Sequence, residues 1–290
     1  MSRGRVLLLL PALLLLLGAT PTALAVGCPT QRVGYKEALA VLAANECEKL
    51  IVGGPQLSAA EAGALGALLG TNTALQELTI GNDRQDAADL FPQMGTAFLE
   101  DAGAAAIAPG LAENRGLRTV RVQCNWLGPA GGAALAAVLA SNAVLEVLHV
   151  TNNEVGDAGA AALSAALRRP GSALSVLDVS RNVIGMAGVR ALGELIAHPG
   201  GTALREIFAT ANAFTRAGNE VLADAVHRSA TLTRLDVQRE LYHRKDREAM
   251  TAHLSRNARL SGATREQLLA QITELEGKLK TCRANCHNEL

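Results

Sequence analysis

The chain has 290 residues, with 27 basic and 27 acidic side chains and a formal net charge of zero. A chain without surplus positive charge lacks the electrostatic field that holds polyanions, which argues against a nucleic-acid-binding protein. Aromatic residues make up only 2% of the sequence, so the stacking platforms used by single-strand binders are also missing.

The first 25 residues have the layout of a secretory signal peptide. Arg3 and Arg5 precede an apolar block at residues 6–17, and the sequence Ala-Leu-Ala at 23–25 offers a cleavage site. The block is shorter than the roughly 20 residues that a helix needs to cross a bilayer. We therefore expect cleavage after residue 25 rather than a membrane anchor, and no membrane span in the mature chain.

Between residues 47 and 260 the hydrophobic period switches repeatedly from two, typical of a strand, to between three and four, typical of a helix. Four consecutive units of 28 to 30 residues follow the pattern LxxLxVxxNxφGxAGxxALxxxL, in which φ is apolar. Weaker copies extend the series in both directions, which gives about seven units. The units start at Cys47, Leu75, Leu117, Leu145, Leu174, Leu204 and Leu232.

One unit is too small to bury its own apolar side chains. Asn153 ends the strand of the unit at 145–173, where its amide can bond the backbone of the turn and of the adjacent coil. Gly156 and Gly159 allow the tight bend that follows. The predicted inward-facing residues are Leu145, Leu148 and Val150 on the strand and Ala161, Leu163, Ala166 and Leu167 on the helix. Stacked units would share a continuous core between a parallel sheet and a layer of closely packed, alanine-rich helices.

This pattern resembles leucine-rich repeats, specifically the longer ribonuclease-inhibitor-like type, over residues 47–260. The resemblance implies an α/β solenoid with a curved parallel sheet on the concave face and helices on the convex face. It also implies that a protein partner binds the concave face and its rims. Pro55, Asp83 and Glu240 stand where the pattern has Asn, so we expect the terminal units to act as caps.

The unit that starts at Leu75 is longer than its neighbours, and the extra segment is residues 84–97. It carries Leu90, Phe91 and Met94, which are apolar groups where the strand turns toward the helix. We favour a loop that folds back over the sheet or its rim. The alternative is a finger that binds a partner.

The residues between the inward-facing leucines of each strand should face the concavity. The central row reads Thr79, Arg121, His149, Asp178, Phe208 and Asp236, and the next row reads Gly81, Gln123, Thr151, Ser180, Thr210 and Gln238. Trp and Arg are frequent anchors at interfaces. The predicted partner-binding residues are Arg121, Trp126, His149, Asp178, Arg181, Phe208 and Asp236. The alternative is a solvated polar face with incidental aromatic side chains.

The sequence favours a protein that is not an enzyme. Strand spacing would place His149 beside Asp178, with Ser180 and Thr151 nearby, but no nucleophile elbow or oxyanion loop accompanies them. No P-loop, GxGxxG fingerprint or metal-spaced cluster of His and Cys is present in the sequence. We therefore predict no catalytic residue, no metal site and no cofactor.

Five cysteines would enter an oxidising compartment if the signal peptide is used. Cys28 and Cys47 flank the helix-like stretch YKEALAVLAANE, and the predicted N-terminal cap spans residues 26–46. A disulfide between them would seal the open end of the core, as in many secreted repeat proteins, and the alternative is two buried thiols. Cys124 is expected to be alone and near the surface.

Residues 261–286 predict a C-terminal helix with an apolar seam. Leu268, Ile272, Leu275, Leu279, Cys282 and Cys286 follow each other in steps of four and three, as in a coiled coil. Three interpretations stay open: a helix that covers the last repeat, a short coiled coil that makes a homodimer with interchain disulfides, and a redox pair. The redox pair is the least favoured, because Cys-x-x-x-Cys is not the spacing of thiol oxidoreductases.

The last four residues, at 287–290, resemble the KDEL and HDEL retrieval signals of the endoplasmic reticulum. They are His287, Asn288, Glu289 and Leu290, and Asn288 replaces an acidic residue, which would weaken retrieval. We therefore expect a non-enzymatic interaction protein in the lumen of the endoplasmic reticulum that binds a protein partner. The alternatives are a secreted or cell-surface recognition protein and a thiol-redox helper.

Overall fold

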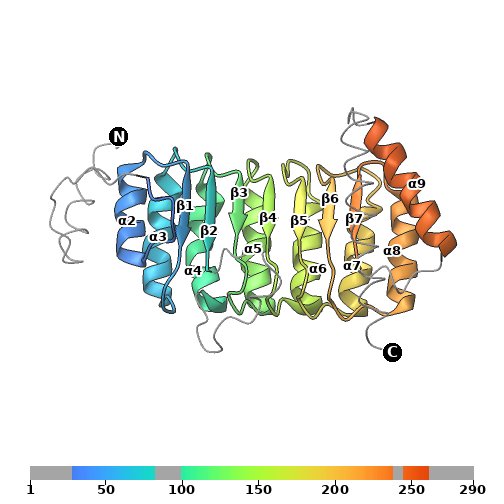
Figure 1. The fold of residues 1–290 in the computed structure, drawn as a ribbon, viewed down its shortest axis with the longest axis horizontal. Helices are drawn as coiled ribbons and strands as arrows, with labels where there is room; N and C mark the ends of the chain where they lie inside the picture. Colours follow the sequence, from blue (N-terminus) through green and yellow to red (C-terminus); the bar gives the residue numbers. More distant parts are fainter. Residues whose placement is uncertain (1–27, 82–98, 238–243, 261–290) are drawn as a thin grey trace.

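The computed structural model describes residues 28–81, 99–237 and 244–260, in which helices and short strands alternate (Figure 1). The strands are β1 (Lys49–Val52), β2 (Glu77–Ile80), β3 (Thr119–Arg121), β4 (Val147–His149), β5 (Val176–Asp178), β6 (Glu206–Phe208) and β7 (Arg234–Asp236). The helices are α2 (Tyr35–Ala44), α3 (Ala59–Thr71), α4 (Glu100–Glu113), α5 (Pro129–Ser141), α6 (Gly156–Leu167), α7 (Met186–Ile196), α8 (Arg216–Arg228) and α9 (Arg244–Leu260).

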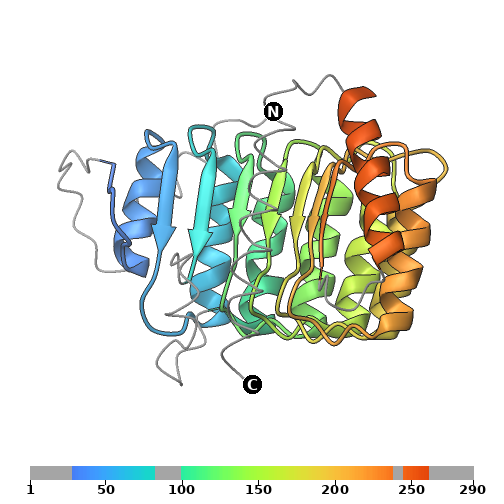
Figure 2. The same cartoon turned by 45° about the vertical axis from the view of Figure 1, so that its right-hand side comes forward.

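All seven strands belong to one parallel sheet, and their order in the sheet is their order in the sequence. The strands pair in register, so equivalent residues of successive units lie side by side. Figure 2 shows the sheet on one side of the molecule and the helices stacked behind it. The predicted α/β solenoid, with a parallel sheet on the concave face and helices on the convex face, is confirmed.

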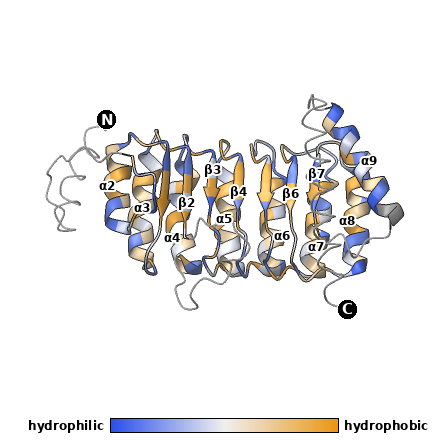
Figure 3. Cartoon of the chain, viewed as in Figure 1, coloured by the Kyte–Doolittle hydropathy of each residue, from blue (hydrophilic) through white to orange (hydrophobic). Residues whose placement is uncertain are grey.

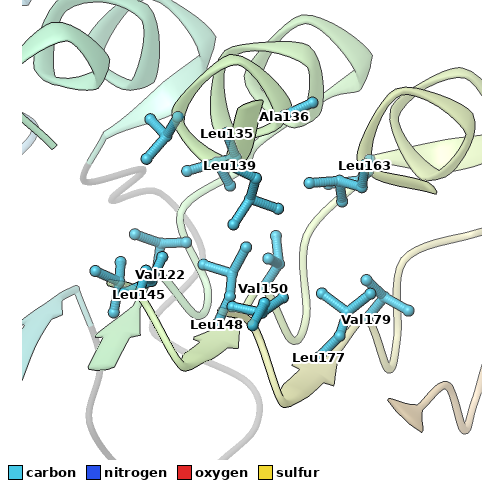
Figure 4. Packing of buried hydrophobic residues seen from close by; sticks show 14 of the residues in the cluster. Val122, Leu135, Ala136, Leu139, Leu145, Leu148, Val150, Leu163, Leu177 and Val179 are labelled. Carbon is cyan, nitrogen blue, oxygen red and sulfur yellow. The ribbon is translucent and has the colours of Figure 1, made fainter. Parts of the chain in front are cut away.

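The core lies between the sheet and the helices, and hydrophobic residues occur on the strands and on the helices (Figure 3). Leu148 and Val150 from β4 and the turn after it lie opposite Leu139 of α5 and Leu163 of α6 (Figure 4), and all four are buried. One predicted core residue is wrong, because Ala161 is exposed and Ala160 is buried in its place. Residues two apart on a helix point to nearly opposite sides, so Ala161 cannot share the inner face of Leu163.

Neighbouring helices approach closely where both present glycine. A Cβ atom added to Gly132 of α5 would lie 2.9 Å from the Cα atom of Gly159 on α6. A Cβ added to Gly110 of α4 would collide with the backbone of Gly66 on α3. Small side chains therefore set the spacing of the helical layer, in agreement with the predicted close packing.

A ladder of asparagines fixes the turns at the strand exits. The side-chain carbonyl of Asn153 accepts hydrogen bonds from the backbone N–H groups of Asn125 and Leu127, at 2.9 and 3.0 Å. Its amide donates to the backbone carbonyls of Val122 and Val150. The side chain thus bonds both its own coil and the preceding one, as predicted. We call this the exit ladder, and its members are Asn125, Asn153, Asn182 and Asn212, all buried.

A second ladder lies at the opposite edge, where helices end. The side-chain carbonyl of Asn142 accepts hydrogen bonds from the N–H groups of Val144 and Leu145, and its amide donates to the carbonyls of Leu111 and Asn114. This helix-end ladder consists of Asn72, Asn114, Asn142 and Asn257. It is interrupted in the middle of the molecule, because the turns at 168–175 and 197–205 are Pro-Gly turns without asparagine.

Two aspartates cap the helix of the coil that follows them. Oδ1 of Asp101 accepts hydrogen bonds from the N–H groups of Gly128 and Gly131, both at 2.7 Å, at the start of α5. Asp157 does the same at the start of α7. The first N–H groups of a helix lack partners within the helix, and its N-terminus favours negative charge. The caps therefore join α4 to α5 and α6 to α7.

The N-terminal end of the solenoid is closed by α2 and a disulfide. Cys28 and Cys47 are bonded, with their Cα atoms 5.3 Å apart. A bridge between Val33 and Val52 extends the edge of the sheet beside β1. Among the described ranges, no helix combines the length and the apolar character that crossing a membrane would require.

Candidate binding surface

The central row of the concave face is the row that the sequence predicts. Register pairs Thr79 with Arg121, Arg121 with His149, His149 with Asp178, Asp178 with Phe208, and Phe208 with Asp236. Adjacent strands lie about 4.8 Å apart, so these side chains form one line across the sheet. From Arg121 to Asp236 they are partly buried, whereas Thr79 is buried.

At the N-terminal side of the sheet, one carboxylate serves two cations. Glu77 Oε2 lies 3.2 Å from Nη1 of Arg121 and 3.5 Å from Nζ of Lys49. Glu77 and Lys49 belong to a row two residues before the central row. The Arg121 side chain is only 24% exposed, so this pair is held more firmly than an ordinary surface pair.

In the middle of the sheet, His149 and Asp178 contact each other across strands β4 and β5. Nδ1 of His149 lies 3.5 Å from Oδ2 of Asp178, and the backbone N–H of Ser180 donates to Oδ1 of Asp178 at 2.9 Å. Burial alone would raise the pKa of Asp178, but hydrogen bonds from His149 and Ser180 outweigh it and hold that pKa below its usual value. Asp178 therefore stays ionised at neutral pH.

At the C-terminal side, an arginine covers an aromatic ring. The guanidinium of Arg234 lies 4.5 Å from the centre of the Phe208 ring, a cation–π arrangement. The same guanidinium is 3.6 Å from Oε2 of Glu206. Asp236 follows on the next strand in the row of Phe208.

Two large apolar side chains project from the strand-exit edge, which is the edge that carries the exit ladder. Trp126 follows Asn125 and is 52% exposed, and Val183 follows Asn182 and is 63% exposed. Both have left-handed backbones, with φ of 55° and 49°, which bulky and β-branched residues rarely adopt. Arg181 lies at the same edge and is also exposed.

Five of the predicted contact residues therefore share one row, and two lie at the edge. Arg121, His149, Asp178, Phe208 and Asp236 form the row, and Trp126 and Arg181 belong to the edge in different coils. Sequence reasoning missed the row that precedes the central one, although the same alternation marks it. It also missed Val183, which occupies the repeat position of Trp126. The missed residues of the preceding row are Lys49, Glu77, Glu206 and Arg234.

The other predicted sites fall outside the described residues. They are the loop residues Leu90, Phe91 and Met94, the seam cysteines Cys282 and Cys286, and the retrieval-like residues His287, Asn288, Glu289 and Leu290. The signal-like segment at 1–25 and the predicted helix at 261–286 also lie there. Over the described ranges, no three His, Cys, Asp or Glu residues are grouped so that they could hold a metal ion.

Alternating strands and helices, in-register stacking and a buried asparagine at four of the strand exits give an α/β solenoid with the architecture of leucine-rich repeats. In agreement, three stretches of the chain match a family model described as leucine rich repeat, at residues 113–136, 141–164 and 173–193. These stretches lie in the central coils, from β3 to α7, where the sequence pattern is most regular. No curated protein matches the chain significantly.

Two solved structures are similar to this chain at low sequence identity. One is described as the tropomodulin C-terminal domain from Caenorhabditis elegans; it has 11% identity and a TM-score of 0.41, over 71% of this chain and 96% of that one. The other is described as leiomodin-1 actin-binding site 2; it has 16% identity and a TM-score of 0.34, over 82% of this chain and 97% of that one.

Proposed function

We propose that this chain is a non-enzymatic protein-binding module that holds a protein partner on its concave face and strand-exit edge. The observation that carries the proposal is the central row, where arginine, histidine, aspartate and phenylalanine side chains lie one strand apart and partly exposed. Arginine and aromatic side chains supply a large share of the binding energy at protein interfaces. Trp126 extends this set to the edge.

Contacts within the face support recognition of another protein surface. Arg121 is fixed by Glu77, His149 contacts Asp178, and the Phe208 ring packs under Arg234. Side chains that are already ordered lose less rotamer entropy when a partner binds. A face that is arranged before binding can therefore use more of its contact energy for affinity.

Site-specific photocrosslinking tests the proposal. Phe208 is replaced by the photoreactive analogue benzoylphenylalanine, which keeps an aromatic ring in the row. The matched control carries the same analogue at Ala161, which is exposed on the convex helix α6. We expect the probe at 208 to crosslink a defined set of proteins that the probe at 161 does not. Identical crosslinking patterns at the two positions would contradict the proposal.

The crosslink should also depend on the edge. We expect Trp126→Ala to weaken capture by the probe at 208, because truncating an exposed tryptophan anchor at an interface costs about 2 kcal/mol. Arg190→Ala is the control, since Arg190 is exposed on the helix α7, outside the proposed surface. Equal losses from both variants would remove Trp126 from the binding surface.

We also propose that the chain resides in the lumen of the endoplasmic reticulum. The signal-like segment at 1–25 and the HNEL tail at 287–290 support this location together, because retrieval receptors act only on proteins that enter the secretory pathway. An internally tagged chain should be retained in cells, and the same chain without residues 287–290 should be secreted. Secretion of both forms would favour the secreted alternative.

A further inference from the structure

The concave face carries surplus positive charge over β1 to β3. Its charged side chains there are Lys49, Glu77 and Arg121, two positive and one negative, which gives a net charge of +1. Both cations share the single carboxylate of Glu77. We call this region the basic end.

The opposite end of the face carries surplus negative charge. Over β5 to β7 the charged side chains are Asp178, Glu206, Arg234 and Asp236, three negative and one positive, which gives a net charge of −2. The lowered pKa of Asp178 keeps that carboxylate ionised at neutral pH. We call this region the acidic end. Strand β4 separates the two ends and contributes only His149 as a titratable group to the face.

The two ends are far enough apart to act independently on a bound segment. Arg121 lies on β3 and Asp236 on β7, four strands away, which corresponds to about 19 Å. The screening length at physiological salt is about 8 Å. Each end therefore attracts the opposite charge locally without cancelling the other.

The charges occupy two rows, and this favours a helix over an extended strand. Lys49, Glu77, Glu206 and Arg234 lie in the row two residues before the central row, and residues two apart on a strand are separated by about 6.6 Å. A helix is about 10 to 12 Å wide and can cover both rows. A single extended strand is about 5 Å wide and would cover one.

We infer that the concave face binds a partner helix that places acidic side chains over the basic end and basic side chains over the acidic end. This inference rests on the proposed function and specifies the chemistry of the partner. At 1.5 Å per residue, the two charged groups of such a helix are separated by about 13 residues. Opposite potentials across an interface steer encounter and fix the register of binding.

Two synthetic peptides of identical composition test the inference. The ordered peptide is a helix-forming alanine and glutamine sequence with four glutamates at one end and four lysines about 13 residues away. The mixed peptide contains the same residues with glutamate and lysine alternating. Binding to the purified full chain is measured by fluorescence anisotropy at low and at physiological salt. We expect the ordered peptide to bind about tenfold more tightly than the mixed one.

Charge reversals locate the effect on the face. Arg121→Glu and Asp236→Lys should each weaken binding of the ordered peptide severalfold. Arg168→Glu and Asp224→Lys are the matched controls, because these residues lie outside the sheet and form surface ion pairs with Glu194 and Arg228, respectively. The controls should bind the ordered peptide like the unmodified chain. Thermal melts of all four variants verify that they remain folded.

The outcomes separate this inference from the proposed function. Three results would overturn the inferred order of charges on the partner helix. They are equal binding of both peptides, no binding of either peptide, and equal losses of binding in the face and control variants. If the probe at 208 still captures proteins in that case, the concave face remains a binding surface with another chemistry. If the probe at 208 captures nothing that the probe at 161 does not, the proposed function fails, whatever the peptides do.

Discussion

The exit ladder and the helix-end ladder connect coils at opposite edges of the solenoid, but only the first is unbroken across the central coils. At the strand exits, Asn125, Asn153, Asn182 and Asn212 each donate to the backbone of the preceding coil. At the helix ends, the series of asparagines stops after Asn142 and resumes at Asn257. The turns at 168–175 and 197–205 are longer and contain Pro-Gly, and in the turn at 229–233 the Ser229 hydroxyl accepts the hydrogen bonds from Thr231 and Leu232 instead.

The difference shows which edge fixes the geometry of the molecule. Neighbouring strands in a sheet keep a constant separation. One buried asparagine side chain can therefore span the gap between coils at each of the four exits of the ladder. Helices are held by side-chain packing, which tolerates a change in turn length. The rows of the concave face therefore stay in register even where the helix-end ladder is absent.

The largest expected effect comes from breaking the exit ladder at Asn153. Asn153→Ala removes five hydrogen bonds and leaves the buried N–H groups of Asn125 and Leu127 without these partners, so we expect a loss of about 3 kcal/mol in the free energy of unfolding. Urea denaturation measures it. Glu154→Ala, at the exposed neighbouring residue, should change stability by less than about 0.5 kcal/mol. A loss of similar size in both variants would contradict the role of the ladder.

The same substitution in the helix-end ladder should cost less. Asn142→Ala removes four hydrogen bonds, and the Val144 N–H that it leaves belongs to a partly exposed residue and can be hydrated. We expect a loss of about 2 kcal/mol by the same denaturation experiment. If Asn142→Ala cost as much as Asn153→Ala or more, the two edges would not differ in the way proposed.

A charged side chain near the exit ladder adds a contribution that depends on pH. The pKa of Asp178 is lower in the folded chain than its ordinary value, so its contribution is complete above the ordinary carboxyl range and is lost as the pH falls through the lowered value. We expect Asp178→Asn to destabilise the chain by about 1 kcal/mol at pH 7. The difference from the unmodified chain should shrink in denaturation experiments at progressively acidic pH. A difference that grows on acidification would reverse the assigned direction.

The smallest effect is expected where the helix-end ladder is absent. There, an ion pair between Arg168 and Glu194 joins α6 to α7 at 2.7 Å, and both side chains are substantially exposed. We expect Arg168→Ala to cost about 0.3 kcal/mol and the cost to disappear at high salt. Thermal melts at low salt and in 1 M salt measure this loss of stability and its dependence on salt. A loss above that of Asn142→Ala would show that the ion pair replaces the missing asparagine.

Much of the fold and of the central row follows from the sequence alone. The spacing of Leu145, Leu148 and Val150 fixes which strand residues face the core, and a slip of one residue would expose all three. The central row is therefore determined once the inward residues are known. The helix offers a weaker constraint, because Ala160, Ala161 and Ala162 are chemically alike, and the wrong alanine was assigned to the core.

The remaining features depend on contacts between coils that a single unit does not reveal. Asn142 and its equivalents lie between one repeat motif and the next, so the alignment of leucines passes over them. Asp101 and Asp157 stand two coils apart, although each lies in the first turn of its helix. The sharing of Glu77 by two cations depends on side-chain distances across three strands, which sequence spacing does not determine.

The disulfide between Cys28 and Cys47 makes the two ends of the solenoid unequal in stability, so one end should unfold before the other. The bond closes a loop with a sequence separation of 19 residues, and closing a loop of that length stabilises a chain by about 3 kcal/mol. At the other end of the described chain, α9 packs on α8 without a covalent link. Fraying should therefore begin at α9 and travel toward β1, so that limited proteolysis trims the last coils first and leaves an N-terminal fragment.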